Sequence, residues 1–185
     1  MLQQPTLHTQ RLILRPFRGE DAEDLGRLLN DERITRNTLN IQFPYDVTIA
    51  EKWLSGLLEL AEKGTDYSFA ITFPDEDRVQ GCIGIHKNER HLRAGVGYWI
   101  APTLWNKGYM TEILSVVIDF GFEEWNLMRM EASHFTHNPQ SGRVMQKAGM
   151  TLEGTQRGYL RKQEVQHDNV LYAITREDWA RKTIK

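Results

Sequence analysis

The sequence of 185 residues contains a single cysteine, Cys82, so an intramolecular disulfide is excluded. A lone cysteine is typical of a reducing compartment, and we expect a cytoplasmic protein. No apolar run approaches the roughly 18 residues that a membrane-spanning helix needs. The richest stretch, Ile113 to Phe122, is interrupted by Asp119, and residues 1–11 lack the apolar centre of a signal peptide. The sequence therefore predicts no membrane partner.

A strong charge of one sign is also missing. Lys and Arg number 23 against 25 Asp and Glu, which leaves a formal net charge of −2. Such a balance gives no electrostatic argument for nucleic acid as a partner, although an RNA- or ribosome-binding module is kept as an alternative. Repeats, low-complexity tracts and Pro/Gly-rich linkers are absent as well. We therefore predict one domain over residues 1–185, with a core of about 9–179.

Apolar spacing alternates between the periods of strands and helices. The order of segments predicts an α/β fold (an α+β mixed sheet) with helices on both faces. Strands are expected at 11–15, where Pro16 ends the strand, and at 67–73, 80–86, 93–100, 130–135, 154–159 and 165–174, with a polar turn at 74–77. Helices are expected at 20–29, 48–61, 108–124 and 139–148, and a short one at the C-terminus.

Two helices carry clear end signals. Thr48 followed by Glu51 has the spacing of a capping box, and Gly149 stands where a left-handed residue ends a helix. Asn138 stands at the N-cap position of the 139–148 helix. The apolar face expected for the 48–61 helix consists of Ile49, Trp53, Leu54, Leu57, Leu58 and Ala61; that expected for the 108–124 helix consists of Met110, Ile113, Leu114 and Val117.

The segment from Gly97 to Glu112 is the most informative part of the chain. A strand ends, a short loop follows, and a helix begins near Gly108, with Lys107 beside it. The first N–H groups of a helix lack internal partners and carry partial positive charge, so such an end can hold a phosphate or pyrophosphate. The Gly-Lys-Ser/Thr end of a P-loop is missing, which argues against nucleotide hydrolysis. The alternative is an ordinary connection with a helix-starting glycine.

This segment resembles motif A of the GNAT N-acetyltransferase superfamily, Arg/Gln-x-x-Gly-x-Gly/Ala, although Trp105 and Met110 depart from that consensus. A tryptophan preceded by Gly-Tyr-Trp is typical of the branch that contains the ribosomal-protein N-terminal acetyltransferases. Four other segments are similar to that branch in the same order: Thr9 to Arg15, Arg129 to Ala132, Asn138 to Met150, and Asp168 to Tyr172 with Arg176 to Trp179. The resemblance implies a single-domain GNAT-like acyl-CoA N-acyltransferase fold.

The resemblance also implies a binding site for acetyl-CoA as cosubstrate. Backbone N–H groups of Asn106, Lys107, Gly108, Tyr109, Met110 and Thr111 would hold the pyrophosphate. Tyr98, Trp99 and Ile100 would pair with the pantetheine arm, and the N–H near Ile100 would polarise the thioester carbonyl. Asn138 would bind the pantetheine arm unless it is only a helix cap. Arg143 would reach the adenosine phosphates unless it is only a solvated helix charge.

The candidate catalytic residues are Ser141, Ile100 and His86. The resemblance assigns Ser141 as the acid for the departing thiolate; the alternative is a solvent-facing serine. His86 is a candidate base or part of the amine pocket, with a structural or surface histidine as the alternative. Gly95 stands where many relatives have a glutamate, and Met145 where many have a tyrosine acid. His134 and His137 lack carboxylate or cysteine partners at ligand spacing, so no metal is expected.

We therefore predict an acyl-CoA-dependent N-acetyltransferase that moves an acetyl group to an amine by direct attack. An α-amine such as a ribosomal or other protein N-terminus is favoured as acceptor. The alternatives are a small-molecule amine and a degenerate sensor that binds acyl-CoA without turnover. Residues 33–46 are expected to shape the acceptor pocket. The sequence does not decide the oligomeric state; relatives often form homodimers.

Overall fold

The computed structural model describes residues 4–183, so part of the segment assessed for a signal peptide lies outside the described residues. The chain forms two compact units. The first runs to Gly84 and includes Tyr98–Tyr109; the second comprises Ile85–Gly97 and continues from Met110. The one-domain assignment stays a prediction. None of the helices within residues 4–183 is long and apolar enough to cross a membrane.

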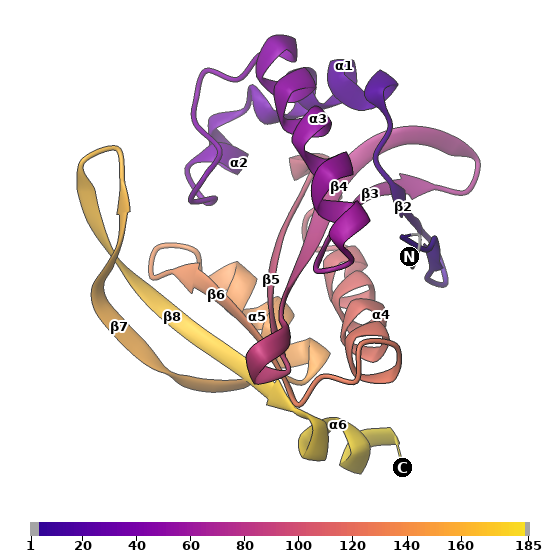
Figure 1. Cartoon of the computed structure of the whole chain (residues 1–185). Coiled ribbons are helices and arrows are strands. Elements are labelled where there is room, and N and C mark those ends of the chain that lie inside the picture. Colours follow the sequence, from indigo (N-terminus) through magenta and orange to yellow (C-terminus); the bar gives the residue numbers. More distant parts are fainter. Residues whose placement is uncertain (1–3, 184–185) are drawn as a thin grey trace. The chain divides into compact units, whose positions relative to one another are not determined.

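The first unit combines the strand order β1-β2-β3-β4 with three helices. β2 pairs antiparallel with both β1 and β3, with Leu14 opposite Ile71. Helices α1 and α3 pack against each other above these strands (Figure 1). The elements are β1 (Leu7–His8), β2 (Ile13–Pro16), α1 (Ala22–Leu29), α2 (Glu32–Thr35), α3 (Val47–Lys63), β3 (Asp66–Phe73), the first part of β4 (Glu76–Asn88), and 3-10 turns at Gly19–Asp21 and Pro102–Leu104.

The core of this unit lies between α1, α3 and the strands. Leu25, Leu29 and Ala50 are fully or almost fully buried, and Trp53 packs edge-on against Phe17 with ring centroids 5.2 Å apart. The expected inward face of α3 is correct for Leu54, while Trp53 and Leu57 are half-buried. Ile49 is 44% exposed and does not belong to that face. The Leu58 side chain lies outside the described part of the chain.

Three local predictions for this unit were wrong. Residue Asp46, not Thr48, caps α3, because its carboxylate accepts the N–H of Ile49 at 3.0 Å. Residues 11–12 belong to a turn, and the strand includes Pro16 rather than stopping before it. The polar turn at 74–77 covers only Pro74 and Asp75, because β4 already begins at Glu76.

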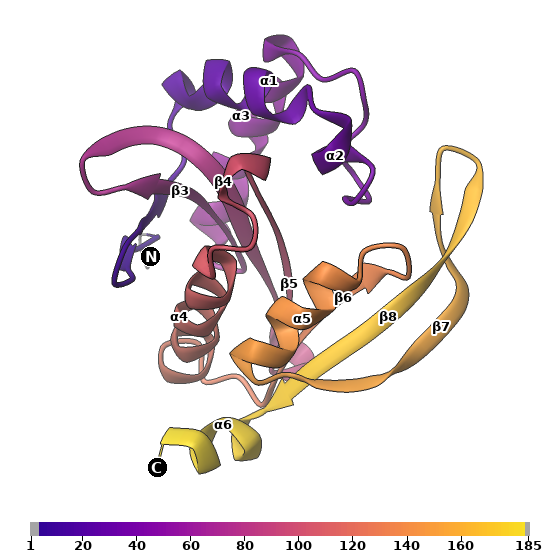
Figure 2. The same cartoon turned by 180° about the vertical axis from the view of Figure 1, so that it is seen from behind.

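The second unit contains the strand order β5-β6-β8-β7. β5 and β6 are parallel, with Ala94 opposite Met130, whereas β8 pairs antiparallel with β6 and β7. The predicted mixed sheet is therefore confirmed. Helix α5 covers one face of β6 and β8 (Figure 2). The elements are β5 (Arg93–Ile100), α4 (Tyr109–Glu123), β6 (Arg129–Phe135), α5 (Pro139–Ala148), β7 (Thr151–Lys162), β8 (Val165–Thr175), α6 (Arg176–Thr183) and a 3-10 turn at Glu89–His91.

Helix α4 buries an apolar face in this unit. Its predicted inward residues Met110, Ile113, Leu114 and Val117 are all buried, as is Trp125 just beyond the helix. Gly149 ends α5 with φ +95°, which confirms the expected C-terminal stop. β7 and β8 form a long two-stranded ribbon (Figure 1), and a register shift lies between Gln156 and Leu160.

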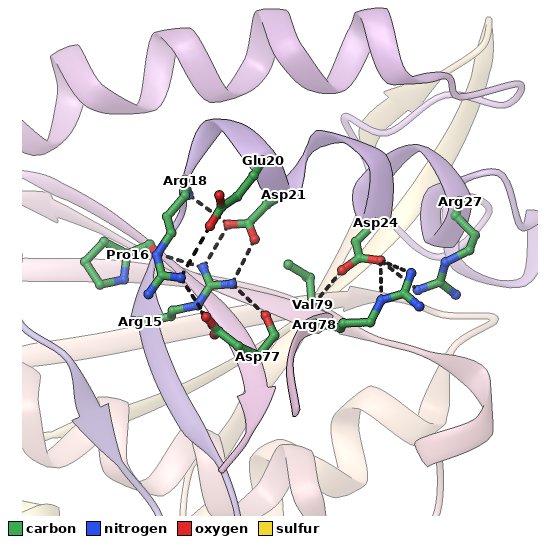
Figure 3. A network of polar contacts seen from close by, with 10 residues as sticks. All are labelled: Arg15, Pro16, Arg18, Glu20, Asp21, Asp24, Arg27, Asp77, Arg78 and Val79. Atoms are coloured by element: carbon green, nitrogen blue, oxygen red, sulfur yellow. Dashed lines mark hydrogen bonds and ion pairs between the residues drawn. The ribbon is translucent and has the colours of Figure 1, made fainter. Parts of the chain in front are cut away.

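A buried arginine joins three parts of the first unit (Figure 3). Arg15 on β2 donates two hydrogen bonds of 2.8 Å to the carboxylate of Asp21, and its Nε donates to Asp77 Oδ1 at 2.5 Å. The remaining donors reach the carbonyls of Pro16 and Asp77. All five guanidinium N–H groups are therefore used, which is the condition under which a charge can be buried.

A second carboxylate, Asp24 on α1, ties this helix to β4 (Figure 3). It accepts the N–H of Val79 at 3.0 Å and the guanidinium of Arg78 at 2.7 Å, and Arg27 donates to it at 3.1 Å. Burial opposes ionisation of Asp24, but the hydrogen bonds from Arg78, Arg27 and Val79 outweigh burial and lower its pKa. The contact holds the carboxylate in its charged form.

We expect Asp24→Ala to destabilise the protein by about 1–3 kcal/mol at pH 7, because the buried N–H of Val79 loses its acceptor. A carboxyl group with a lowered folded-state pKa stabilises above its unfolded pKa, and that stability is lost as pH falls through the folded value. The difference from the unmodified protein should therefore shrink below the ordinary Asp pKa of 3.8. Urea unfolding between pH 7 and pH 3 measures both effects.

Glu177→Ala is the matched control, because it removes a carboxylate from an exposed pair with Arg181. It should leave the midpoint of unfolding almost unchanged. A loss at Asp24→Ala that equals this control, or that persists unchanged at pH 3, would contradict the role given to Asp24.

Candidate functional site

The end of β5 lies close to β4 in the first unit. The N–H of Ala101 donates to the carbonyl of Gln80 at 2.8 Å. A Cβ at Gly81 would lie 2.6 Å from the Trp99 carbonyl oxygen and 3.0 Å from the Ile100 Cα, so this approach requires glycine. The Ile100 side chain is buried, while Tyr98 and Trp99 are half-buried. Backbone contacts thereby hold the end of β5 against the middle of β4.

The loop after β5 turns through left-handed backbone. Asn106 has φ +61° and Gly108 has φ +80°, a region that favours glycine and tolerates asparagine. The indole N–H of Trp105 donates to the Ile100 carbonyl at 2.9 Å and fixes the start of the loop. Asn106, Lys107 and Gly108 are exposed. Left-handed residues next to a helix start turn successive N–H groups outward, which is an anion-binding arrangement.

Helix α4 begins at Tyr109, one residue later than predicted. Tyr109 is half-buried, and its ring packs edge-on against Phe73 with centroids 5.7 Å apart. Met110 is buried and Thr111 is half-buried, so only their backbone groups suit the predicted role toward a phosphate. The first N–H groups of α4, which have no acceptor within the helix itself, follow directly from the exposed loop.

Arg11 is a neighbour of this loop that the sequence analysis missed. It was assigned to a strand, but it lies in the turn before β2 and its Nη1 donates to the Lys107 carbonyl at 3.2 Å. Its guanidinium also lies 4.2 Å from the centre of the Tyr109 ring. The usable signal was the threonine at position 9, whose hydroxyl accepts the N–H groups of Arg11 and Leu12, a local pattern that favours a turn over a strand.

Helix α5 carries three of the predicted residues in the second unit. Asn138 holds the N-cap position, but its side chain makes no capping hydrogen bond. The capping alternative therefore does not explain this asparagine. Ser141 is half-buried, with its N–H on the Asn138 carbonyl at 3.2 Å. Arg143 is exposed, and Met145 is 1% exposed one turn beyond Ser141.

Of the two histidines next to α5, His134 is packed as a structural group and His137 is exposed. His134 is buried, with its Nδ1 2.8 Å from the Phe135 carbonyl and its ring stacked on Tyr172 at 5.8 Å. A Cβ at Gly142 would lie 2.6 Å from His134 Nε2, so α5 approaches β6 closely through this glycine. His137 stacks on Phe135. Among residues 4–183, no group of three His, Cys, Asp or Glu side chains is arranged to hold a metal ion.

The comparison with known families agrees with this arrangement. The family model of the acetyltransferase (GNAT) domain matches residues 11–151, which include the loop, α4 and α5. The chain belongs to the GNAT acetyltransferase family.

Individual GNAT relatives cover nearly the whole chain. The N-acetyltransferase YoaA of Bacillus subtilis (strain 168) is 30% identical over 173 residues, which are 93% of this chain and 97% of YoaA. The [ribosomal protein uS5]-alanine N-acetyltransferase of Escherichia coli (strain K12) is 29% identical over 187 residues, covering 94% of this chain and 92% of that protein. The protein is therefore an acyl-CoA-dependent N-acetyltransferase.

Solved structures support the same fold. RimJ of Mycobacterium smegmatis, in complex with CoA-disulfide, has a TM-score of 0.83 at 26% identity and covers 95% of this chain and 89% of that chain. The ribosomal L7/L12 alpha-N-protein acetyltransferase RimL, in complex with coenzyme A, has a TM-score of 0.84 at 18% identity, over 92% of this chain and 98% of that chain. At that identity the second likeness concerns the fold alone.

Two positions of this GNAT protein lack the side chains that many relatives use for proton transfer. Gly95 on β5 has no described heavy atom within 4 Å of where a Cβ would stand, so packing at the Cβ position does not require glycine here. Met145 is fully buried in the core of its unit. His86, the other candidate for the base, is exposed on β4. Its role stays a prediction.

The thiol of Cys82 lies in the apolar core of the first unit. It is buried, and desolvation raises its pKa to about 12. At pH 8 roughly one thiol in 10⁴ would then be ionised, and the thiolate is the nucleophilic form. An acyl-enzyme at this cysteine is therefore disfavoured, in agreement with direct attack by the amine.

We expect Cys82→Ala to keep kcat within about twofold of the unmodified enzyme, because the thiol takes no part in the reaction. Iodoacetamide at pH 8 should alkylate the native protein far more slowly than the protein unfolded in guanidinium, which mass spectrometry measures directly. Rapid alkylation of the native protein with parallel loss of activity would contradict this assignment.

Proposed function

We propose that the protein transfers the acetyl group of acetyl-CoA to an α-amine by direct attack. A protein N-terminus, such as that of a ribosomal protein, is the favoured acceptor, and such an acceptor would place the reaction in the cytoplasm. The observation that carries the proposal is the exposed loop of Asn106, Lys107 and Gly108, whose left-handed backbone leads into the start of α4. The GNAT relatives that acetylate ribosomal proteins support the choice of acceptor.

The loop fits the phosphates of CoA by its chemistry. The available donors are backbone N–H groups, which bind phosphate oxygens without a sequence-specific side chain. Lys107 adds an exposed positive charge at the same point. β5 continues to Ile100, beyond its four-residue register with β6, and thereby supports strand-like pairing of Tyr98, Trp99 and Ile100 with a pantetheine arm. The side chain of Asn138 makes no capping hydrogen bond, which supports a role for it toward the same arm.

In the proposed reaction the amine nitrogen attacks the carbonyl carbon of the thioester. The new C–N bond forms while the C–S bond breaks, CoA leaves as a thiolate, and the nitrogen loses one proton to solvent water. The N–H near Ile100 would stabilise the negative charge that develops on the carbonyl oxygen. Ser141 would donate a hydrogen bond to the departing sulfur. Arg143 would act on the adenosine phosphates through its positive charge alone.

The acceptor follows from proton chemistry. Without the glutamate that Gly95 replaces, the enzyme depends on amines that are already partly neutral. An α-amino group has a pKa of about 7.7–8.0 and a lysine amine one of about 10.4. At pH 7.5 about a third of an α-amine is neutral, against roughly 0.1% of a lysine side chain. An α-amine is therefore the better substrate for such a site.

We expect acetyl-CoA to raise the melting temperature and to be turned over with a peptide that has a free N-terminus. Thiol release at pH 7.5 should be much faster with this peptide than with an Nα-acetylated peptide containing lysine. Gly108→Val is the control, since a β-branched residue disfavours φ +80° and should abolish the thermal shift. Thermal stabilisation without thiol release from any amine would favour the sensor, and a preference for lysine or a polyamine would exclude the proposed acceptor.

We expect Ser141→Ala to lower kcat by about 10- to 100-fold, near the bottom of the range for a positioned acid. The loss should be modest because a thiol with a pKa of about 8.5 departs fairly well unprotonated. The KM for acetyl-CoA should change little, since the contact strengthens as charge develops on sulfur. Steady-state kinetics measure both constants.

Ser55→Ala is the matched control for Ser141, because Ser55 is exposed on α3 and its hydroxyl bonds only the carbonyl of Glu51 in its own helix. It should leave kcat and KM unchanged. An unchanged kcat in Ser141→Ala would return Ser141 to a surface serine, and a large rise in KM with normal kcat would make it a binding residue instead.

A further inference from the structure

Arg11 is held in place by a tight turn between β1 and β2. The hydroxyl of Thr9 accepts the N–H of Arg11 at 3.3 Å and that of Leu12 at 2.9 Å. The N–H of Thr9 in turn donates to the Leu12 carbonyl at 2.9 Å. These local hydrogen bonds fix residues 9–12, and the side chain of Leu12 is buried. The turn presents the exposed side chain of Arg11 from a rigid base.

The guanidinium of Arg11 lies against three consecutive residues, the last two of the loop and the first of α4. Its Nη1 donates to the Lys107 carbonyl at 3.2 Å, and its Nη2 lies 3.6 Å from where a Cβ of Gly108 would stand. Its central carbon lies 4.2 Å from the centre of the Tyr109 ring, a cation–π distance. The planar head group is therefore fixed by a hydrogen bond on one residue and by a ring face on another.

The hydrogen bond to Lys107 has a consequence for the next residue. The peptide bond between Lys107 and Gly108 is trans, since the cis bond recorded in the described chain joins Phe43 and Pro44. In a planar trans peptide the C=O and the following N–H point in opposite directions. A guanidinium that holds the Lys107 carbonyl therefore directs the Gly108 N–H away from Arg11. That N–H belongs to the row of donors expected to face a pyrophosphate.

We propose that Arg11 is the positioning residue of the phosphate-binding loop. It fixes the Lys107–Gly108 peptide in the orientation that presents the Gly108 N–H, and it places a positive charge on the carbonyl side of that peptide. The inference rests on the proposed use of acetyl-CoA and goes beyond it by assigning this role to a residue 96 positions away in the sequence. The contacts of Arg11 described above fall on the Lys107 carbonyl and the Tyr109 ring, so its proposed contribution concerns the donors that face phosphates.

The test follows from this proposed restriction to the donors that face phosphates. Acetyl-CoA and acetyl-pantetheine present the same thioester, but acetyl-pantetheine lacks the nucleotide and its phosphates. We expect Arg11→Ala to raise the Kd and the KM for acetyl-CoA by about tenfold or more, the effect of losing a charge-assisted hydrogen bond, with kcat almost unchanged. Turnover of acetyl-pantetheine should be the same in Arg11→Ala and in the unmodified enzyme. Calorimetry measures the Kd without reference to activity.

Arg11→Lys separates geometry from charge. Lysine keeps the positive charge but cannot hold a carbonyl and stack on Tyr109 with one planar group, so it should restore only part of the affinity. Arg181→Ala is the control for the change in net charge, because Arg181 pairs with Glu177 on the exposed face of α6. It should bind acetyl-CoA as the unmodified protein does.

The outcomes are distinct. A wild-type Kd in Arg11→Ala, or complete rescue by Arg11→Lys, would overturn the positioning role. Equal losses with acetyl-CoA and acetyl-pantetheine would show general damage to the fold and would overturn it too. If the unmodified protein binds no acetyl-CoA, the proposed function itself fails, a result that the variants of Arg11 cannot produce.

Discussion

The direction of a few backbone N–H groups before α4 is the constraint on which the site depends. Positive φ angles at Asn106 and Gly108 bring the chain from the end of β5 into a helix within a few residues. A side chain at position 108 would require an unfavourable backbone conformation, although its Cβ would make only ordinary contact with the guanidinium of Arg11. The groups proposed to bind the phosphates are therefore part of the main chain, and side chains would matter chiefly by fixing its conformation.

The same division between main-chain and side-chain roles holds elsewhere in the first unit. Gly81 permits the carbonyl of Trp99 to come closer than any Cβ would allow. The buried pair of Arg15 and Asp21, together with Asp24, connects β2 and β4 to the start of the helical layer through fully used donors. Removal of one partner from such a buried pair strongly destabilises the folded protein. These networks therefore hold one arrangement of α1 over the strands.

Much of this structure could be predicted from the sequence, because the relevant signals are local. β5 and α5 begin and end where apolar spacing and end residues indicate, and the left-handed Gly149 stops α5 as expected. The wrong assignments fall where several local signals compete. Asp46 and Thr48 can both cap a helix, and only packing decides between them. The short helix α2 is too brief to show a period at all.

The site was predictable in part for the same reason. The loop and α5 carry their signals in consecutive residues, whereas Arg11 reaches the loop from a turn 96 positions earlier, a relation that spacing cannot reveal. The burial of the Cys82 thiol could not be read from the sequence either. Cys82 looks like any cysteine in the sequence, but its apolar surroundings raise the pKa of its thiol to about 12 and remove it as a nucleophile.

This member of the family has neither a glutamate at position 95 nor a tyrosine at position 145, and both absences limit its chemistry. No described heavy atom lies within 4 Å of where a Cβ of Gly95 would stand, and Met145 is buried where the family resemblance implied a hydroxyl. A reaction whose leaving group is a thiolate needs little acid assistance, and an α-amine needs little help in losing its proton near neutral pH. Under those two conditions catalysis can depend mainly on holding the two reactants in position, and the rigid loop before α4 is suited to that task.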